Sequence, residues 1–369
     1  MQYLVNNVYV YYKKQKIQLV LNLKNPFLLV LGGIMMKKII NLGVIGSGAI
    51  AENFLNAASN FKHLNFHTFY SRNKDTAEKF KNKYDFNKAS TSLDEMSKDT
   101  ELDAVYIASP NAFHHDQAIL FLENKKHVLC EKAFASNYTQ ALNIINTAKK
   151  NNVVIMEAMR LTCLPNFINI KNNLHKIGKI RRYFASYCQY SSRYDKFKDG
   201  IIMNAFKKEL SNGSLMDIGV YCLSPMINLF GKPHDIKCNS FLLNNGVDGQ
   251  GSAILDYGDM DAVILYSKIA NSNIPSEIQG EKGSIIIDKI NTFKNVKLIY
   301  NDGTVENLSE DQYDNDMYYE IEEFIKLIDC SDIKATYSSL NTLDNTLDTI
   351  STIDSIRNKL DIVFPADRM

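Results

Sequence analysis

Three side chains in this sequence have types and spacings that could support acid–base chemistry. Lys132 follows the apolar run His127–Cys130 and comes directly after Glu131. Asp217 and Tyr221 are four residues apart on a helical pattern, so their side chains share one face. An ammonium group stabilises negative charge on oxygen and favours the phenolate form of a nearby tyrosine, which can then exchange a proton with a hydroxyl group. We therefore predict Lys132, Tyr221 and Asp217 as catalytic residues.

Each of these residues also has a purely structural interpretation. Asp217 could be a charge at the start of a helix, and Tyr221 could be a core aromatic residue. A charged side chain at the end of a buried strand is energetically costly unless it is paired, and the Glu131 carboxylate could pair with the Lys132 ammonium group. The occurrence of all these residues in one chain favours the functional interpretation.

A glycine motif, Gly46-x-Gly48-x-x-Ala51, connects an apolar run to a helical pattern. The first glycine allows a tight turn, the second lets a pyrophosphate approach the backbone, and the small third residue lets the helix lie close to the strand. The N–H groups at the start of that helix would then face the phosphates. The residues predicted to bind the phosphates are Gly46, Ser47, Gly48, Ala49 and Ile50.

The next strand pattern ends in Ser71-Arg72, about 20 residues past the glycines. NAD-binding sites carry an acidic residue there, which bonds the ribose hydroxyls. Its absence removes a repulsion against a 2′-phosphate, and Arg72 offers that phosphate a bidentate partner. Ser71 and Arg72 therefore favour NADP over NAD; the alternative is that Arg72 is a solvated charge and both cofactors are used.

Further polar residues follow two other strand patterns. Ser109, Pro110, Asn111 and His114 come after the run that ends at Ala108, where the ligand edge of such a sheet is expected. We predict that these four residues, with Glu131 and Lys132, contact the cofactor. Arg160 follows the last strand of this half and is predicted to help bind substrate with Lys132, Asp217 and Tyr221.

The first half of the chain must position these groups, and it alternates strand and helix patterns. This alternation predicts a doubly wound parallel sheet, a Rossmann domain. The expected strands are Ile39–Ile45, Asn65–Tyr70, Ala104–Ala108, His127–Cys130 and Val153–Met156. The expected helices are Ala49–Ser59, Asp75–Tyr84, Ser92–Lys98, His114–Glu123 and Tyr138–Lys150.

After about Arg160 the pattern changes to longer β-rich runs, which predict a C-terminal α+β domain with an open, mostly antiparallel sheet. The expected strands are Ile180–Tyr190, Ile236–Leu243, Gly251–Tyr257, Ala262–Ser267, Ser276–Gly280 and Ser284–Asp288. The expected helices are Leu215–Phe230, Tyr318–Ile328 and Leu340–Leu360.

Length and composition set broad limits on the class of protein. A chain of 369 residues accommodates about two domains. The net charge of +1 is spread along the chain, which argues against a nucleic-acid partner. The six cysteines form no C-x-x-C pair, so we expect reduced thiols, no metal site and a cytoplasmic location.

The first residues stand apart from this pattern. The apolar piece Phe27–Leu31 is too short to span a bilayer, so no membrane partner is expected. We predict that residues 1–35 are an extension upstream of the working protein; a signal or anchor and a genuine extra element are the alternatives. The predicted Rossmann domain is then 36–158, and the substrate and oligomerisation domain is 159–369.

These motifs together resemble the glucose–fructose oxidoreductase / inositol dehydrogenase / MocA (Gfo/Idh/MocA) family, from Lys37 to the C-terminal helices. The glycine motif, the segment from Ser109 to His114, the Glu131-Lys132 pair and the Asp217/Tyr221 pair match motifs of that family. The resemblance implies a lysine that is catalytic or orients the substrate. It also implies a homodimer or homotetramer formed through the C-terminal sheet.

Two positions depart from the family pattern. Ala133 stands where the family's E-K-P motif has proline, which leaves the loop less constrained. Tyr221 stands where inositol dehydrogenases have histidine. The tyrosine form resembles the branch with dimeric dihydrodiol dehydrogenase and NADP-dependent xylose dehydrogenases, which agrees with Arg72.

The resulting hypothesis is an NAD(P)-dependent oxidoreductase. It would move a hydride between the nicotinamide and a secondary alcohol or hemiacetal carbon of a sugar, cyclitol or dihydrodiol. One alternative is a dinucleotide-binding sensor of the same fold without turnover. Another is a reductase for a non-sugar carbonyl, although the hydrogen-bonding side chains of Ser191–Asp195 favour a polyhydroxylated ligand.

Overall fold

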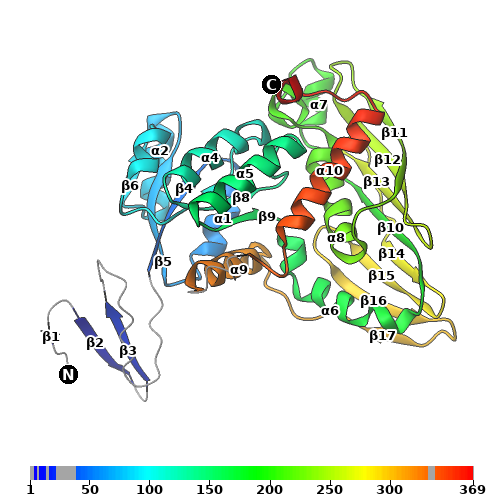
Figure 1. Cartoon of the computed structure of the whole chain (residues 1–369), viewed down its shortest axis with the longest axis horizontal. Coiled ribbons are helices and arrows are strands. Elements are labelled where there is room, and N and C mark those ends of the chain that lie inside the picture. Colours follow the sequence, from blue (N-terminus) through cyan, green and yellow to red (C-terminus); the bar gives the residue numbers. More distant parts are fainter. Residues whose placement is uncertain (1–3, 6–7, 14–15, 22–38, 331–336, 369) are drawn as a thin grey trace.

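The computed structural model describes residues 4–5, 8–13, 16–21, 39–330 and 337–368 (Figure 1). Two sheets, each covered by helices, account for most of these residues. The helices found in the described ranges include none that is long and apolar enough to cross a membrane.

The N-terminal sheet is parallel and six-stranded, in the order β6-β5-β4-β7-β8-β9. This is the doubly wound order of dinucleotide-binding domains, which confirms the predicted Rossmann fold. Its strands are β4 (Ile40–Ile45), β5 (Leu64–Tyr70), β6 (Lys88–Ser90), β7 (Ala104–Ile107), β8 (His127–Glu131) and β9 (Ile155–Ala158). Its helices are α1 (Ala49–Ala58), α2 (Lys74–Tyr84), α3 (Leu93–Lys98), α4 (His114–Glu123) and α5 (Tyr138–Asn151).

The strand order reverses between β4 and β7, and the glycine turn lies at that point. Gly46 has φ of +114°, and a Cβ atom there would stand 2.5 Å from the carbonyl oxygen of Ala108. Only glycine therefore allows the chain to leave β4 so close to the end of β7. Ligands of open α/β sheets bind in the crevice at such a reversal.

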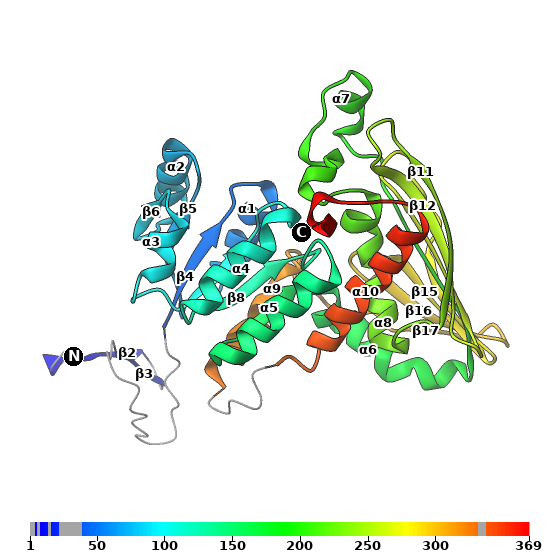
Figure 2. The ribbon, with the colours of Figure 1, turned by 45° about the horizontal axis from the view of Figure 1, so that its top comes forward.

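The C-terminal sheet has eight strands in the order β11-β12-β13-β10-β14-β15-β16-β17. Only the β10–β13 pair is parallel, so the prediction of a mostly antiparallel sheet is confirmed. The strands are β10 (Ile180–Cys188), β11 (Asp235–Leu242), β12 (Asp248–Asp256), β13 (Asp261–Ser267), β14 (Ser276–Gly280), β15 (Gly283–Lys289), β16 (Lys294–Tyr300) and β17 (Val305–Asn307). Helices α8 (Val220–Phe230) and α10 (Leu343–Lys359) cover one face of it (Figure 2).

Helix α9 (Met317–Asp329) comes late in the chain but packs in the core of the N-terminal sheet (Figure 1). Ile321 and Phe324 belong to the same buried cluster as Phe54 of α1. The Tyr318 ring stacks on Phe61, with ring centroids 4.6 Å apart. A helix from the second half of the chain therefore packs in the core of the first half and joins the two.

Some elements differ from the predicted ones. The expected helix Leu215–Phe230 consists of a π-helical turn, Leu215–Gly219, followed by α8. The strand expected at Val153–Met156 is β9, Ile155–Ala158, and Val153 and Val154 are buried in the connection before it. The elements not predicted include α6 (Pro165–Asn173), α7 (Tyr194–Lys198), β6, β16 and β17, which are short or half exposed and show weak periodicity.

Within the first residues, β1 (Leu4–Val5), β2 (Val8–Lys13) and β3 (Lys16–Leu21) form an antiparallel three-stranded sheet. Among the described strands, these pair with one another and not with the two larger sheets. The apolar piece Phe27–Leu31 lies outside the described residues.

Candidate active site

Lys132 lies in the loop directly after β8, at the carboxyl edge of the parallel sheet, and it reaches into the other domain. Its Nζ donates to Asp217 Oδ1 at 2.8 Å and to the Asp217 carbonyl oxygen at 2.9 Å. Burial alone would lower the pKa of Lys132, but the Asp217 charge beside it holds that pKa above its ordinary value. The loop and the π turn, 85 residues apart in sequence, thus meet through an ion pair of a protonated lysine.

The second oxygen of the same carboxylate is bound by Lys268, which the sequence analysis missed. Its Nζ donates to Asp217 Oδ2 at 2.7 Å and to the Ala205 carbonyl oxygen at 3.0 Å. Burial would raise the pKa of Asp217, but the two ammonium groups hold it far below its usual range. The feature of the sequence that could have pointed to Lys268 is its position directly after the alternating strand pattern Ala262–Ser267.

Tyr221 lies one helical turn beyond Asp217, as their spacing predicts, and two cations adjoin it. Lys132 Nζ is 4.8 Å from the centroid of its ring, and the Arg160 guanidinium carbon is 5.1 Å away. Arg160 Nη1 also donates to the Tyr221 hydroxyl oxygen at 2.9 Å. A lysine and an arginine thus adjoin a phenol hydroxyl, which is a group that can exchange a proton with a substrate hydroxyl.

Arg160, which was predicted to bind substrate, contacts other residues of the protein in this structure. Its Nε forms an ion pair with Asp316 Oδ1 at 2.9 Å, and its Nη2 donates to the Asn291 carbonyl oxygen at 3.4 Å. Its side chain is 17% exposed. The guanidinium is therefore held in place by the second domain and directed at Tyr221.

Glu131 and His114 lie beneath the loops, each with protein partners. Glu131 accepts from the Tyr106 hydroxyl at 2.5 Å and from the Lys132 backbone N–H at 3.1 Å. His114 is fully buried, with its ring nitrogens 3.0 Å from the Ala133 carbonyl oxygen and 2.8 Å from that of Ser109. Through these contacts the two residues support the site loops. Their predicted contact with the cofactor stays a prediction.

The loop after Lys132 is held by the packing of Ala133. The Lys132–Ala133 peptide bond is cis, and Ala133 is fully buried. His114 contacts the carbonyl oxygen of Ala133, as described above. The packing around Ala133 therefore positions the loop where the family motif has proline.

The start of α1 fits a pyrophosphate group. Gly48 is the N-cap residue, no side chain caps the first turn, and a Cβ atom on Gly48 would meet nothing within 4 Å. The first N–H groups of a helix need partners, and phosphate oxygens are suited to that position. The run from Gly46 to Ile50 thus has the geometry of a dinucleotide cradle.

A cleft of about 460 Å³ adjoins the end of β5 and lies between the domains. From the first domain it is lined by Arg72, Pro110 and Phe113, and from the second by Asn204, Lys207, Glu209 and Leu210. Asn111 connects the domains beside it, since its Nδ2 donates to the Ser211 carbonyl oxygen at 3.0 Å. Ser109 is engaged locally, with its Oγ donating to Gln117 at 2.7 Å. The cleft offers positive charge where the adenosine end of a dinucleotide is expected.

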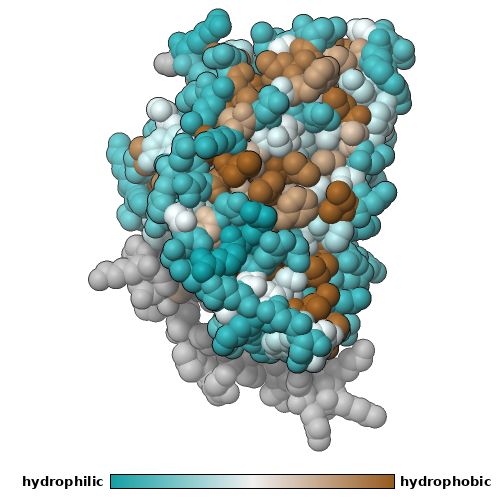
Figure 3. Space-filling model, turned by 90° about the vertical axis from the view of Figure 1, so that its right-hand side faces the viewer, coloured by the Kyte–Doolittle hydropathy of each residue, from teal (hydrophilic) through white to brown (hydrophobic). Residues whose placement is uncertain are grey.

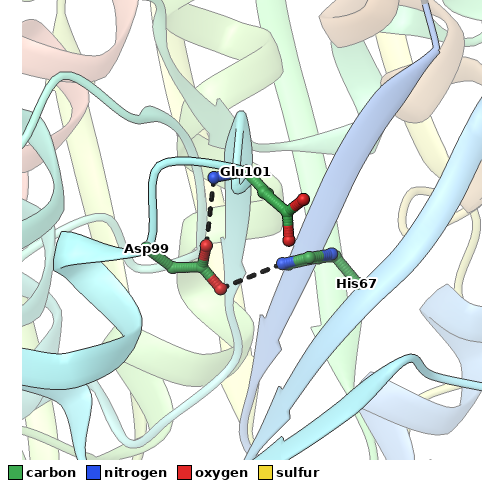
Figure 4. A group of neighbouring side chains, drawn as sticks. All are labelled: His67, Asp99 and Glu101. Carbon is green, nitrogen blue, oxygen red and sulfur yellow. Dashed lines mark hydrogen bonds and ion pairs between the residues drawn. The ribbon is translucent and has the colours of Figure 1, made fainter. Parts of the chain in front are cut away.

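One group in the described residues has the spacing of a metal site, and it lies away from these loops. Ligand atoms of His67, Asp99 and Glu101 come within 4.8 Å of one another (Figure 4). Lys88 Nζ already donates to Asp99 at 2.7 Å and to Glu101 at 3.4 Å. The Lys88 ammonium group therefore already offsets part of the negative charge of this cluster.

A Rossmann domain with a helix-end phosphate cradle, joined to an open-sheet domain that supplies a carboxylate and a tyrosine, defines a dinucleotide-dependent oxidoreductase. Comparison of the chain with protein-family models leads to the same class. Residues 40–159 match the model of an oxidoreductase family with an NAD-binding Rossmann fold, and residues 174–286 match the Gfo/Idh/MocA C-terminal domain. The chain belongs to the Gfo/Idh/MocA family.

Curated relatives and solved structures extend this result. The chain is 47% identical over 329 residues to scyllo-inositol 2-dehydrogenase (NADP(+)) IolU of Bacillus subtilis, covering 89% of this chain and 99% of that protein. It is 30% identical over 253 residues to trans-1,2-dihydrobenzene-1,2-diol dehydrogenase of Xenopus tropicalis, covering 66% and 74%. The structure of levoglucosan dehydrogenase with NADH matches with a TM-score of 0.77 at 18% identity, covering 87% and 97%, which shows the shared fold.

Proposed function

We propose that this protein is an NADP-dependent dehydrogenase that acts on a CH–OH group of a sugar, cyclitol or dihydrodiol. The observation that carries the proposal is the cluster of Lys132, Asp217, Tyr221 and Arg160 at the edge of the sheet that also holds the phosphate cradle. The names of the relatives, among them the inositol and dihydrodiol dehydrogenases, support the class of substrate.

The bound dinucleotide supplies the nicotinamide carbon that takes up or gives back a hydride. In the oxidative direction, the substrate hydroxyl gives its proton to the Tyr221 oxygen, and its carbon becomes a carbonyl as the hydride leaves. Lys132 and Arg160 adjoin the ring and the oxygen of Tyr221, so they stabilise the phenolate that accepts the proton. In the reverse direction Tyr221 returns the proton.

Asp217 has a second task in this proposal. Its side chain remains 35% exposed although both oxygens accept from lysines. Each carboxylate oxygen has two lone pairs, so one on each remains for a neighbouring hydroxyl of the substrate. A polyhydroxylated ring would thus be held by Asp217 while one of its hydroxyls faces Tyr221.

The preference for NADP rests on Arg72 in the interdomain cleft and on the absence of a carboxylate in Ser71-Arg72 after β5. A guanidinium forms bidentate hydrogen bonds with a phosphate group, which NAD lacks at the 2′ position. The NADP(+) in the name of the inositol dehydrogenase supports the same preference.

We further propose that the outer face of the C-terminal sheet forms a subunit interface. Ile254, Val263 and Phe184 are register neighbours on β12, β13 and β10, and Ile254 is 51% exposed. The adjacent row of Ala253 and Ile264 faces the core. Apolar groups are visible on this face (Figure 3). An exposed apolar sheet face is typical of an interaction site.

A turnover screen tests the function. The purified protein would be incubated with NADP or NAD and a panel of cyclitols, aldoses and trans-dihydrodiols, and formation of reduced nicotinamide would be followed. Turnover on one class, with NADP favoured, is the expected result. Tight binding of NADP without turnover on any member of a broad panel would favour a sensor and contradict the proposal.

A further inference from the structure

Lys268 is a buried lysine with no place in the reaction described so far. It directly follows β13, and its side chain is 2% exposed. Its ammonium group is fixed by Asp217 and the Ala205 carbonyl oxygen, and it lies 5.0 Å from the centroid of the Phe206 ring. A long flexible side chain loses conformational entropy when it is held in this way, so its partners must compensate that cost.

We propose that Lys268 is a positioning residue of the active site: it holds the Asp217 carboxylate in place and offsets part of its negative charge. The positive charge of Lys132 is then not cancelled by Asp217 and acts on Tyr221. This inference rests on the proposed function. With Lys132 as its only partner, Asp217 would cancel the charge of that lysine. With both lysines on the one carboxylate, the group of three keeps a net charge of +1.

The groups around Asp217 and Tyr221 leave it to Lys268 to offset the charge of Asp217. The other charged or titratable groups near Tyr221, Asp217 and Arg160 include Glu131, Tyr187, Asp248, Asp316 and Glu320. Arg160 is paired with Asp316. Burial raises the pKa of Glu131 and raises that of Asp248 to about 7. Among the described residues, Lys268 is the cation that binds the Asp217 oxygen that Lys132 does not bind, since Lys132 donates to Oδ1 and Lys268 to Oδ2.

The shared carboxylate of Asp217 connects Lys268 to Lys132, which lies beside the Tyr221 ring. Asp217 lies in the π turn and Tyr221 in the first turn of α8. Without the Lys268 charge, Asp217 offsets the charge of Lys132 alone, so less positive charge acts on the neighbouring oxygen of Tyr221. The charge of Lys268 should therefore appear in the pH dependence of the reaction as well as in its rate.

The test compares three variants by kcat, KM and the pH profile of kcat/KM. Lys268→Met removes the charge and Lys268→Arg keeps it. Lys126→Met is the matched control: Lys126 is also buried and also donates to carbonyl oxygens, but it lies before β8, at the opposite end from Lys132. Thermal unfolding of each variant shows how much folded protein is assayed.

For Lys268→Met we expect about a tenfold lower kcat at neutral pH, a change in KM below about threefold, and a higher midpoint in the pH profile of kcat/KM. Lys268→Arg should return the midpoint to the wild-type value, and Lys126→Met should not move it. Lower turnover of Lys268→Met with an unchanged midpoint would show a merely structural role and overturn the proposal. A shift in Lys268→Arg as large as in Lys268→Met would also overturn it.

A second measurement needs no substrate. In a crystal structure of Lys268→Met, the Asp217 carboxylate should turn so that both of its oxygens face Lys132. An unchanged carboxylate overturns the positioning role. If the wild-type protein turns over no substrate but the carboxylate moves in the variant, the proposed function fails while the positioning role stands.

Discussion

Replacing Lys132 with methionine removes the charge beside Tyr221 and keeps most of the volume of the side chain. The ammonium nitrogen is 4.8 Å from the centroid of the tyrosine ring. At that separation, and with an effective dielectric constant of about 20, two unit charges interact by about 3.5 kcal/mol. Since 1.4 kcal/mol corresponds to a factor of ten in rate, the loss approaches 300-fold, and Arg160 compensates part of it.

We therefore expect Lys132→Met to lower kcat by at least ~10²-fold and to leave the affinity for NADPH within about threefold. Steady-state turnover and the fluorescence of bound NADPH measure the two quantities separately. Lys126→Met is the matched control, because Lys126 and Lys132 flank the same strand, β8. A Lys132→Met protein that folds and keeps more than a tenth of the wild-type turnover would refute the electrostatic role assigned to Lys132.

Three other predictions concern the cofactor, stability and assembly. Arg72→Ser should lower kcat/KM for NADP by about 10- to 100-fold and change kcat/KM for NAD by less than threefold, because only NADP carries the 2′-phosphate. Equal losses for the two cofactors would contradict the role of Arg72. Burial raises the pKa of Glu157 to about 7, so the folded protein keeps a proton that the unfolded chain loses near pH 4.5, and stability falls as pH rises between these values. Glu157→Gln should remove this slope, worth roughly 3 kcal/mol, when urea unfolding is compared at pH 4.5 and 7.5; an equal slope in both proteins would refute it. Ile254→Glu should shift the protein to monomer in light scattering without lowering its melting temperature, and an unchanged mass would argue against the sheet interface.

The parts of the site that sequence reasoning located are those with a local signal. Gly46 and Gly48 follow an apolar run, and Lys132 follows another, so their place at the sheet edge comes from the strand pattern alone. The four-residue spacing of Asp217 and Tyr221 likewise holds, although a π turn precedes the α-helix. Short-range periodicity is sufficient for such features.

The contacts between distant segments could not be obtained in this way. Lys268 meets Asp217 only because β13 ends beside the π turn, and a lysine after a strand is ordinarily a solvated residue. The partners of Arg160 are Asp316 and Asn291, which come from the segment before α9 and a late loop. One sequence read by itself does not carry the pairing of such segments.

The position of α9 has a consequence for the order in which the chain can fold during synthesis. Ile321 and Phe324 fill the core that β4, β5 and α1 begin, yet they leave the ribosome after all the strands of the second sheet. At ~5–20 residues per second, the first domain waits roughly 10–30 s for its last helix. Its unfinished apolar surface is exposed during that interval, so chaperones that bind nascent chains have a defined segment to protect, and a ribosome stalled before α9 should hold a protease-sensitive first domain.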